Sequence, residues 1–152
     1  MTQVSELLAH KGGEVWSIGP ANSVYQAIEM MALKGIGALT VVSDAGDLIG
    51  IVSERDYARK IILLGKSSKE TLVSDIMTLR VIYVTPDDEV KNCLALMTDK
   101  RVRHLPVLEE NRLIGMISVG DLVKSIIDQQ SYTIDQLERY IKGEVTDISY
   151  QS

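Results

Sequence analysis

The sequence predicts a mixed α/β (α+β) fold, built from two tandem βαββα repeats related by a pseudo-twofold axis and followed by a short C-terminal helix. The first observation is a duplication, because the pattern of residues 35–57 returns at residues 101–122. The second is the spacing of the copies, which is 66 residues before the turn at residues 43–47 and 65 after it. Hairpin tips tolerate insertions, so a gap confined to a turn indicates that the copies are structural equivalents.

The first repeat is expected to begin with a strand and an amphipathic helix. Weak alternation of apolar and polar residues at positions 15–18 indicates the strand, and Pro20 to Ser23 supply a turn and an N-cap. Apolar residues then recur at the spacing of a buried helical face. The helix should end at Gly35, because glycine takes the left-handed conformation at little steric cost.

A hairpin and a second helix complete the first repeat. Residues 38–42 and 48–52 have the composition of strands, and Gly46 supplies the turn between them. The second helix follows Ser53 and is expected to stop at Gly65. Four residues should form its buried face, namely Tyr57, Ala58, Ile61 and Ile62.

The second repeat copies this order. We expect a strand at residues 81–84, a helix from Asp87, and strands near residues 104–108 and 113–117. The single cysteine, Cys93, lies on the apolar stripe of that helix, which favours a buried thiol over a nucleophile or a disulfide partner. The closing helix should bury the equivalents of the first repeat's apolar residues, which are Leu122, Val123, Ile126 and Ile127.

Domain boundaries follow from this register. Residues 4–66 form the first repeat, residues 73–130 the second, and residues 131–152 a C-terminal helix and tail. Similar segments at residues 4–8 and 73–77 are expected to be a leading turn of each repeat.

The C-terminal helix is expected at residues 133–142, with Gly143 as its stop. Three apolar residues could dock it on the rest of the chain, namely Ile134, Leu137 and Ile141. Elsewhere, Met30 and Leu96 are equivalent positions off the main apolar stripes. They fit either broader burial inside the monomer or a helix face that meets another copy, and the sequence leaves both open.

Length and charge limit the classes of function. A chain of 152 residues can build one real core, whereas each repeat alone would be marginal, so the halves should fold together. The net charge of −5 argues against a nucleic-acid partner, and no apolar run approaches the roughly 20 residues that span a bilayer. The first residues lack the profile of a signal peptide, so we expect a cytoplasmic protein.

The strongest local motif is a repeated Gly-x-x-Ser-x-x-Asp at the expected strand-to-helix junctions. Found once, Ser-x-x-Asp would be read as a capping box, which stabilises a helix start. Its duplication after glycine-bearing strands adds a second interpretation. The glycines permit close approach of a flat group, the carboxylate can accept hydrogen bonds from ribose hydroxyls, and the serine and free amides suit phosphate or sugar oxygens. The motif comprises Gly50, Ser53 and Asp56, and then Gly115, Ser118 and Asp121.

This paired pattern resembles the cystathionine-β-synthase (CBS) domain pair, or Bateman module, over about residues 4–130. The resemblance rests on IGALTVV and LIGIVSERDY in the first repeat, and on VRHLPVL and LIGMISVGDL in the second. The chain is similar to small stand-alone members that are little more than the pair. The resemblance implies a regulatory module, not an enzyme, with two pseudo-equivalent clefts for adenosine compounds such as AMP, ADP, ATP, NAD or S-adenosylmethionine.

Site residues are implied position by position. On this resemblance Asp56 and Asp121 take ribose hydroxyls, and Ser53 and Ser118 contact ribose or phosphate. The adenine would lie among residues of the first strand and of the segment after the first helix in each repeat. These residues are Trp16, Ile18, Ile36, Gly37 and Ala38, and their counterparts Val102, Arg103 and His104, with Pro106 as a structural residue that could also touch adenine.

The two repeats differ at the positions that often meet phosphate. Gly37 and Ala38 stand where the second repeat has Arg103 and His104, so we expect one strong nucleotide site per chain instead of two equal ones. His104 would make affinity depend on pH near neutrality. Arg55 and Arg59 either add charge to a phosphate tail or are solvated, evenly balanced for Arg55 and with solvation favoured for Arg59.

Two functions from different classes follow. The first is a non-catalytic adenine-nucleotide sensor that forms a homodimer through the helices of stacked pairs. In this dimer Arg103 and His104 of the two chains approach a common centre, and a bound phosphate relieves their repulsion. The occupied site then changes the angle between the two repeats. The alternative is an interaction module that needs no ligand and docks on an enzyme, a transporter or a redox protein. The sequence shows no metal-ligand cluster, no nucleophile with a base and no P-loop, so neither a catalytic cofactor nor an enzymatic activity is expected.

Overall fold

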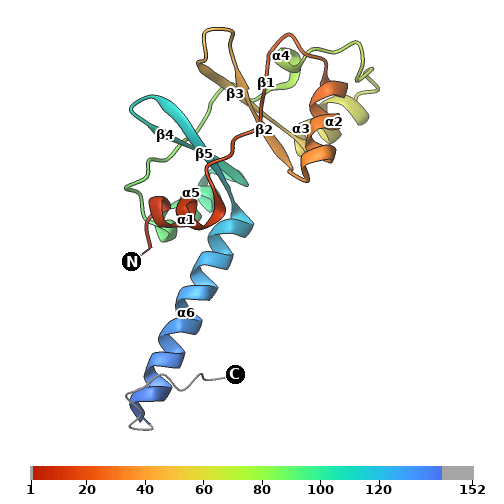
Figure 1. Cartoon of the computed structure of the whole chain (residues 1–152). Helices are drawn as coiled ribbons and strands as arrows, with labels where there is room; N and C mark the ends of the chain where they lie inside the picture. The colour runs from red at the N-terminus through yellow and green to blue at the C-terminus, as the bar shows by residue number, and fades with distance from the viewer. Residues whose placement is uncertain (1, 142–152) are drawn as a thin grey trace.

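Each repeat forms a small α/β lobe, and a long helix leaves the second lobe (Figure 1). The computed structural model describes residues 2–141. The fold class expected from the duplication is confirmed. The first repeat supplies β1 (Ser17–Ile18), α2 (Val24–Lys34), β2 (Ala38–Val42), β3 (Leu48–Ser53), α3 (Glu54–Tyr57) and the π-helix η1 (Ala58–Ile62). The second begins with α4 (Val73–Ile76) and continues with α5 (Val90–Lys100), β4 (His104–Glu109), β5 (Arg112–Ser118) and α6 (Val119–Ile141).

The sheets follow the expected pattern, with one difference between the lobes. In the first lobe β2 lies between β1, to which it is parallel, and β3, to which it is antiparallel. In the second lobe β4 and β5 form an antiparallel pair, and the strand expected at residues 81–84 is reduced to a parallel bridge between Val84 and Val107. The Val84 amide donates to the Pro106 carbonyl, and the Val84 carbonyl accepts from the Leu108 amide. A single residue thus pairs with β4 where a strand was expected.

Local signals set the helix ends in both lobes. Ser23 Oγ accepts from the Gln26 amide at 3.1 Å while Gln26 Oε1 accepts from the Ser23 amide at 2.9 Å, which is a complete capping box. Gly35 ends α2 in the left-handed region at φ 66°, as expected. Helix α5 begins at Val90 instead of Asp87, because residues 85–88 form a turn in which the Thr85 amide donates to the Asp88 carboxylate at 2.8 Å.

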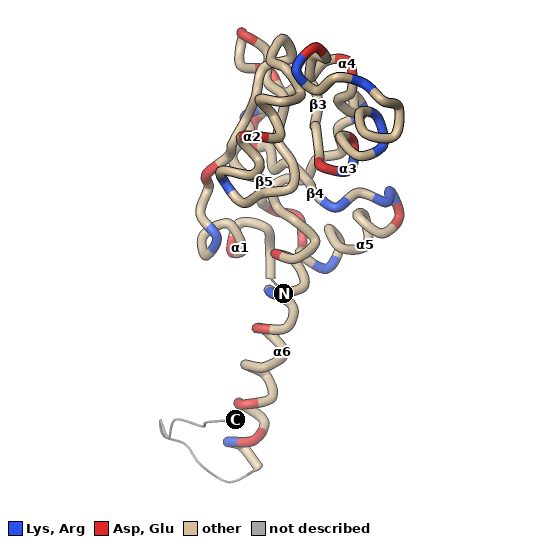
Figure 2. Tube along the Cα trace, turned by 90° about the vertical axis from the view of Figure 1, so that its right-hand side faces the viewer, with Lys and Arg blue, Asp and Glu red and all other residues tan. Residues whose placement is uncertain are grey.

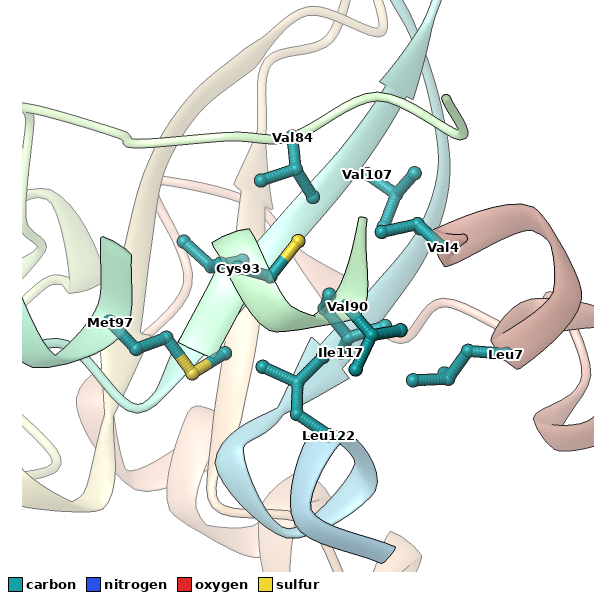
Figure 3. Packing of buried hydrophobic residues seen from close by; sticks show 10 residues of the cluster. Val4, Leu7, Val84, Val90, Cys93, Met97, Val107, Ile117 and Leu122 are labelled. Atoms are coloured by element: carbon teal, nitrogen blue, oxygen red, sulfur yellow. The ribbon is translucent and has the colours of Figure 1, made fainter. Parts of the chain in front are cut away.

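The segments that lead into the repeats exchange between the lobes. Residues 4–8, expected as a turn, belong to the eight-residue helix α1 (Val4–Lys11), which packs on the second lobe. Figure 3 shows Val4 and Leu7 pointing into that core. In the same way α4 packs on the first lobe, where the Val73 amide donates to the Asn22 carbonyl at 2.8 Å. The lobes are therefore tied together, because each core is completed by the leading segment of the other repeat.

The helix after Ser53 does not bury all four residues expected of it. It changes from α3 to the π-helix η1 at Ala58, and Leu63 donates to the Ala58 carbonyl in the wide π pattern. This change of winding leaves Ile61 buried and Tyr57 half-buried but turns Ala58 and Ile62 toward solvent, so the prediction was wrong for those two residues.

The separate C-terminal helix expected at residues 133–142 is also wrong. Helix α6 runs without a break from Val119 to Ile141, because no proline or glycine interrupts residues 121–141. Its start packs on the second lobe through the buried Leu122. Val123, Ile127 and the residues expected to dock the helix are exposed instead: Ile134 (55%), Leu137 (56%) and Ile141 (80%). The expected stop, Gly143, lies outside the described residues.

The remaining core expectations hold. Cys93 is buried at 1% exposure, and burial together with the charge of Asp88 raises the pKa of its thiol to about 11, as fits an inert core residue. Met30 and Leu96 are half-buried and pack against the cores of their own lobes, so burial inside the monomer accounts for much of their apolar character.

Candidate functional site

A cavity of about 540 Å³ lies between the lobes, and we call it the arginine cleft. The β3–α3 junction forms one wall, the α5–β4 junction the opposite wall, and the chain after α4 the third. The residues that line it are Gly37, Ile51, Ser53, Glu54, Arg55, Asp56, Arg59, Thr78, Arg80, Ile82, Arg101, Val102, Arg103 and His104.

Positive charge dominates this cleft. Five arginines line it against the two carboxylates of Glu54 and Asp56. Figure 2 shows lysines and arginines gathered where α3 faces β4 and α5. Within residues 2–141, none of the five arginines lies within ion-pair distance of a carboxylate. Guanidinium groups with no internal partner bind phosphate and carboxylate oxygens well, so the cleft is suited to an anion.

The first Ser-x-x-Asp motif forms a capping box on the wall of the arginine cleft. The Asp56 amide donates to Ser53 Oγ at 3.1 Å, and the Ser53 amide donates to Asp56 Oδ2 at 3.0 Å. The other carboxylate oxygen, Oδ1, lies 3.2 Å from Lys60 Nζ. The capping interpretation of the motif is therefore confirmed. The cap also holds the Asp56 carboxylate in one orientation at the cleft, which is what ribose recognition would require.

The second motif has the same cap but a different neighbour. The Ser118 amide donates to Asp121 Oδ2 at 2.8 Å, as in the first copy. Here Lys11 of α1 also reaches Asp121 Oδ2, at 2.6 Å, and donates to the Met116 carbonyl. Burial raises the pKa of Asp121, but the hydrogen bonds from Lys11 and Ser118 outweigh it and hold the pKa below its usual value. A lysine of the chain itself thus occupies the position beside this carboxylate.

The glycines of the two motifs make room for protein, not for a flat ligand. A Cβ on Gly50 would lie 2.8 Å from Met77 Sδ, and a Cβ on Gly115 would lie 2.8 Å from Leu8 Cδ2. Met77 and Leu8 belong to the exchanged segments around α4 and α1. The interpretation of these glycines as a ligand approach is therefore corrected. They let the leading segments pack closely against β3 and β5.

Gly37 lies where the two lobes meet. A Cβ built there would be 3.0 Å from Glu54 Oε1 and 3.6 Å from His104 Cε1. His104 belongs to the other lobe, and its pKa is lowered by burial first, then by Lys11 and Arg103, with Asp121 acting in the opposite sense. The imidazole is therefore neutral near pH 7, and its pKa lies below the near-neutral value expected from the sequence.

Half of the predicted site residues line the arginine cleft. Those residues are Gly37, Ser53, Arg55, Asp56, Val102, Arg103 and His104. Ser118 and Asp121 lie at the second junction beside Lys11. Trp16 lies under the ammonium group of Lys34, 3.9 Å from the ring centre, and the others are buried or half-buried in the lobes: Ile18, Ile36, Ala38 and Pro106.

The predicted site residues did not include several that line the cleft, and two of these carried a signal in the sequence. Arg80 occupies the place in the α4 segment that Lys11 has in the α1 segment, since both lie seven residues after the leading valine. Arg101 replaces Gly35 at the end of the equivalent helix and takes the left-handed conformation at φ 55°. Arg59, for which solvation was favoured, also lines the cleft. Ile82, which also lines the cleft, belongs to the segment 81–84 that was expected beside adenine, and the other missed residues are Ile51, Glu54 and Thr78.

The described residues contain neither a metal-ligand cluster nor a membrane-spanning helix. No group of three or more His, Cys, Asp or Glu side chains in residues 2–141 is placed to hold a metal ion. Across the same part of the chain, every helix is too short or too polar to cross a membrane.

The chain matches known proteins in both sequence and structure. The CBS domain family model matches residues 4–63 and 73–128. The CBS domain-containing protein CBSX3 of Arabidopsis thaliana, described as mitochondrial, is 40% identical over 151 residues, covering 93% of this chain and 73% of that one. The chain spans between 33% and 61% of the length of three further relatives.

Solved structures give the same fold. The structure of a protein with CBS domains from Burkholderia ambifaria MC40-6 is 52% identical, with a TM-score of 0.81, and the match covers 85% of this chain and 96% of that one. The CBS domain pair of protein MJ0100, in complex with 5′-methylthioadenosine and S-adenosyl-L-methionine, matches with a TM-score of 0.73 at 23% identity and covers 85% of this chain and 98% of that one. At that identity the second match concerns the fold alone.

Proposed function

The chain belongs to the CBS domain family, and from that premise we propose that it is a non-catalytic sensor that binds an adenine nucleotide in the arginine cleft. CBS domain pairs are regulatory, ligand-binding modules, and the match indicates no catalytic family. The fold of MJ0100, which this chain shares, binds adenosine compounds in that protein. Support for a nucleotide in this chain comes from its own residues.

One observation carries the proposal: five arginines that have no ion-pair partner among residues 2–141 line a single cavity together with a capped aspartate. Asp56 is positioned to accept from ribose hydroxyls, while Arg55 and Arg59 on one wall and Arg103 on the other face the phosphates. Such a cleft favours AMP, ADP, ATP or NAD over the sulfonium of S-adenosylmethionine, because a cation would meet five like charges.

One site per chain is the expected stoichiometry. At the second junction Lys11 already satisfies Asp121, so a ribose would have to displace a charged hydrogen bond of 2.6 Å. At the first junction the equivalent Arg80 lines the cleft, and the carboxylate of Asp56 pairs with Lys60 of its own helix.

The response to ligand would be a change in the angle between the lobes. Arginines come from both walls, and a polyanion between them removes their mutual repulsion and favours the closed arrangement by its difference in affinity for the two. The dimer proposed from the resemblance would bring Arg103 and His104 of two chains toward a common centre. Exposed apolar residues at the end of the first lobe offer a surface for that dimer: Leu33, Ile62, Leu63 and Leu64.

Calorimetry with AMP, ATP and NAD tests the binding proposal. Arg103→Ala should weaken the best nucleotide at least tenfold, because a charge-assisted contact is lost, while Arg112→Ala, on the exposed end of β5, should leave it unchanged. Asp56→Asn should weaken nucleotides but not inorganic triphosphate. Absence of heat with every nucleotide on the wild-type protein would end the proposal.

The second candidate is an interaction module that needs no ligand. The observation in its favour is the apolar run at the end of η1, where Ile62, Leu63 and Leu64 are 59%, 76% and 63% exposed. Thermal melting separates the two functions, since a nucleotide at 100 times its dissociation constant stabilises the fold by about 2.7 kcal/mol. An unchanged melting temperature favours docking. The cytoplasmic location stays a prediction, because the Arabidopsis relative is described as mitochondrial.

A further inference from the structure

The far half of α6 projects from the second lobe, as Figure 1 shows. Among residues 2–141 it has no packing partner of the kind that Leu122 has at its start. Its apolar residues are correspondingly exposed: Ile127 (55%), Ile134 (55%), Leu137 (56%) and Ile141 (80%). An isolated helix of this length is marginal in water, so a protein surface that covers this face would stabilise it.

The exposed aliphatic residues of α6 lie on one heptad seam, while the exposed Tyr132 and Tyr140 lie off it. Beginning at Val123, which is 41% exposed, the positions of this seam are spaced by four and three residues, and all but the polar Gln130 are aliphatic. The seam consists of Val123, Ile127, Gln130, Ile134, Leu137 and Ile141. This 3.5-residue period is that of a two-stranded coiled coil, whereas a helix that docks on a globular surface has a wider apolar stripe. The partner should therefore be another helix with the same period.

We propose that this partner is α6 of a second copy of the chain, in antiparallel orientation. Charge complementarity argues for the orientation. When Ile127 is set against the partner's Leu137, the exposed Lys124 lies beside the partner's Glu138, and this pair occurs twice. In a parallel pair Glu138 would instead face the partner's Thr133.

The antiparallel register also determines which residues touch. Gln130 lies opposite the partner's Ile134, and Val123 opposite the partner's Ile141. The polar Gln130 lowers the stability of the seam and penalises other registers. The seam is about 28 Å long at 1.5 Å per residue, so the pairing should be reversible and depend on protein concentration. It uses none of the residues of the arginine cleft and needs no nucleotide.

Disulfide trapping in the full chain tests the register directly. We expect a disulfide when a Gln130→Cys chain is mixed with a differently tagged Ile134→Cys chain under mild oxidation, and less than one tenth as much in either chain alone. Native Cys93 should not interfere, because it is buried and its pKa is raised to about 11. Disulfides in the single-variant samples would mean a parallel pair, and no disulfide in the mixture would mean that another copy does not cover the seam. Either result overturns the proposal.

Charge exchange is a second, independent test on the same trapped pair. Lys124→Glu or Glu138→Lys alone, introduced into both chains, should lower the disulfide yield about threefold, and the two together should restore it. Both positions are off the seam, so circular dichroism should show an unchanged helix content. Failure of the double variant to restore the yield contradicts the orientation. A yield that rises only when the chain is ended after Ile141 would show that the tail covers the seam, and would also overturn the proposal.

A control separates this inference from the proposed function. Arg103→Ala should leave trapping through α6 unchanged while it weakens nucleotide binding. If trapping occurs and no nucleotide binds, the coiled coil stands and the sensor does not, and the reverse result separates them equally well.

Discussion

The two Ser-x-x-Asp junctions have the same local geometry and different surroundings. Ser53 with Asp56, and Ser118 with Asp121, form nearly identical caps. The first faces a cavity lined by arginines, while the second is engaged by Lys11. A duplicated motif therefore repeats a scaffold. The segments that arrive from elsewhere in the chain decide which copy is open to a ligand.

The helix ends before β2 and β4 make the same point. Gly35 and Arg101 both take the left-handed conformation, at φ 66° and φ 55°, where only glycine is free of strain. The strain at Arg101 accompanies a guanidinium on the wall of the arginine cleft. The first lobe thus has an unstrained glycine at this position, and the second lobe has a strained arginine that adds positive charge to the cleft.

The equivalence of the two scaffolds predicts the largest effect. Leu39 and Leu105 are equivalent core residues, and both are 0% exposed. Leu39→Ala and Leu105→Ala should each lower the free energy of unfolding by about 3 kcal/mol, because each leaves a cavity in a closed core. Urea denaturation of both variants checks this. Two separate transitions in either variant would contradict the tying of the lobes by the exchanged helices.

Substitutions of Lys11 and Arg80 test whether the leading segments determine which Ser-x-x-Asp junction can bind a nucleotide. Lys11→Ala should raise the nucleotide stoichiometry from about one toward two per chain, because Asp121 loses its internal partner. Arg80→Ala should instead weaken the existing site several-fold and leave the stoichiometry unchanged. Titration calorimetry measures both quantities. A stoichiometry that stays at one after Lys11→Ala would show that the second junction is limited by something other than this lysine.

Lys11→Ala should also alter the response of stability to acid. The folded pKa of Asp121 lies below its unfolded value, so its contribution to stability is present above the unfolded pKa and is lost as the pH falls through the folded one. The variant should lose less stability than the wild type between about pH 4 and pH 2.

Swapping the residue types at the ends of α2 and α5, Gly35 and Arg101, should change stability and nucleotide binding in opposite directions. Arg101→Gly should raise the free energy of unfolding by about 1 kcal/mol, because the left-handed strain is relieved, and should weaken nucleotide binding. Gly35→Arg should lower stability by about the same amount. Paired melting and calorimetry compare the two. Arg101→Gly that binds as tightly as the wild type would remove Arg101 from the site.

The smallest effect concerns His104, whose equivalent in the first lobe is Ala38. Because the folded pKa of His104 is lowered, the protein should lose stability as the pH falls below about 6.5, and His104→Ala should flatten this slope. A phosphate in the cleft favours the imidazolium, so affinity should rise less than tenfold from pH 7 to pH 5.5. Calorimetry at both pH values checks this, and an equal rise in His104→Ala would assign it to another group.

The structural features that could be predicted from the sequence are those that depend on residues close together in the chain. The Ser23 cap, the stop at Gly35, the hairpins and both Ser-x-x-Asp caps depend on contacts a few residues apart, and they occur as expected. The asymmetry between Gly37 and Arg103 was also visible, because an internal repeat supplies its own comparison.

Only the tertiary structure decided how distant segments meet. Three features depend on such meetings: the exchange of α1 and α4, the pairing of Lys11 with Asp121 across 110 positions, and the placement of Arg80 in the cleft between the lobes. The exposure of the far half of α6 has the same origin, since its apolar residues look like a core in sequence. Amphipathic spacing in the sequence shows which face of a helix or strand is apolar and favours burial. The packing of the whole chain determines what, if anything, covers it.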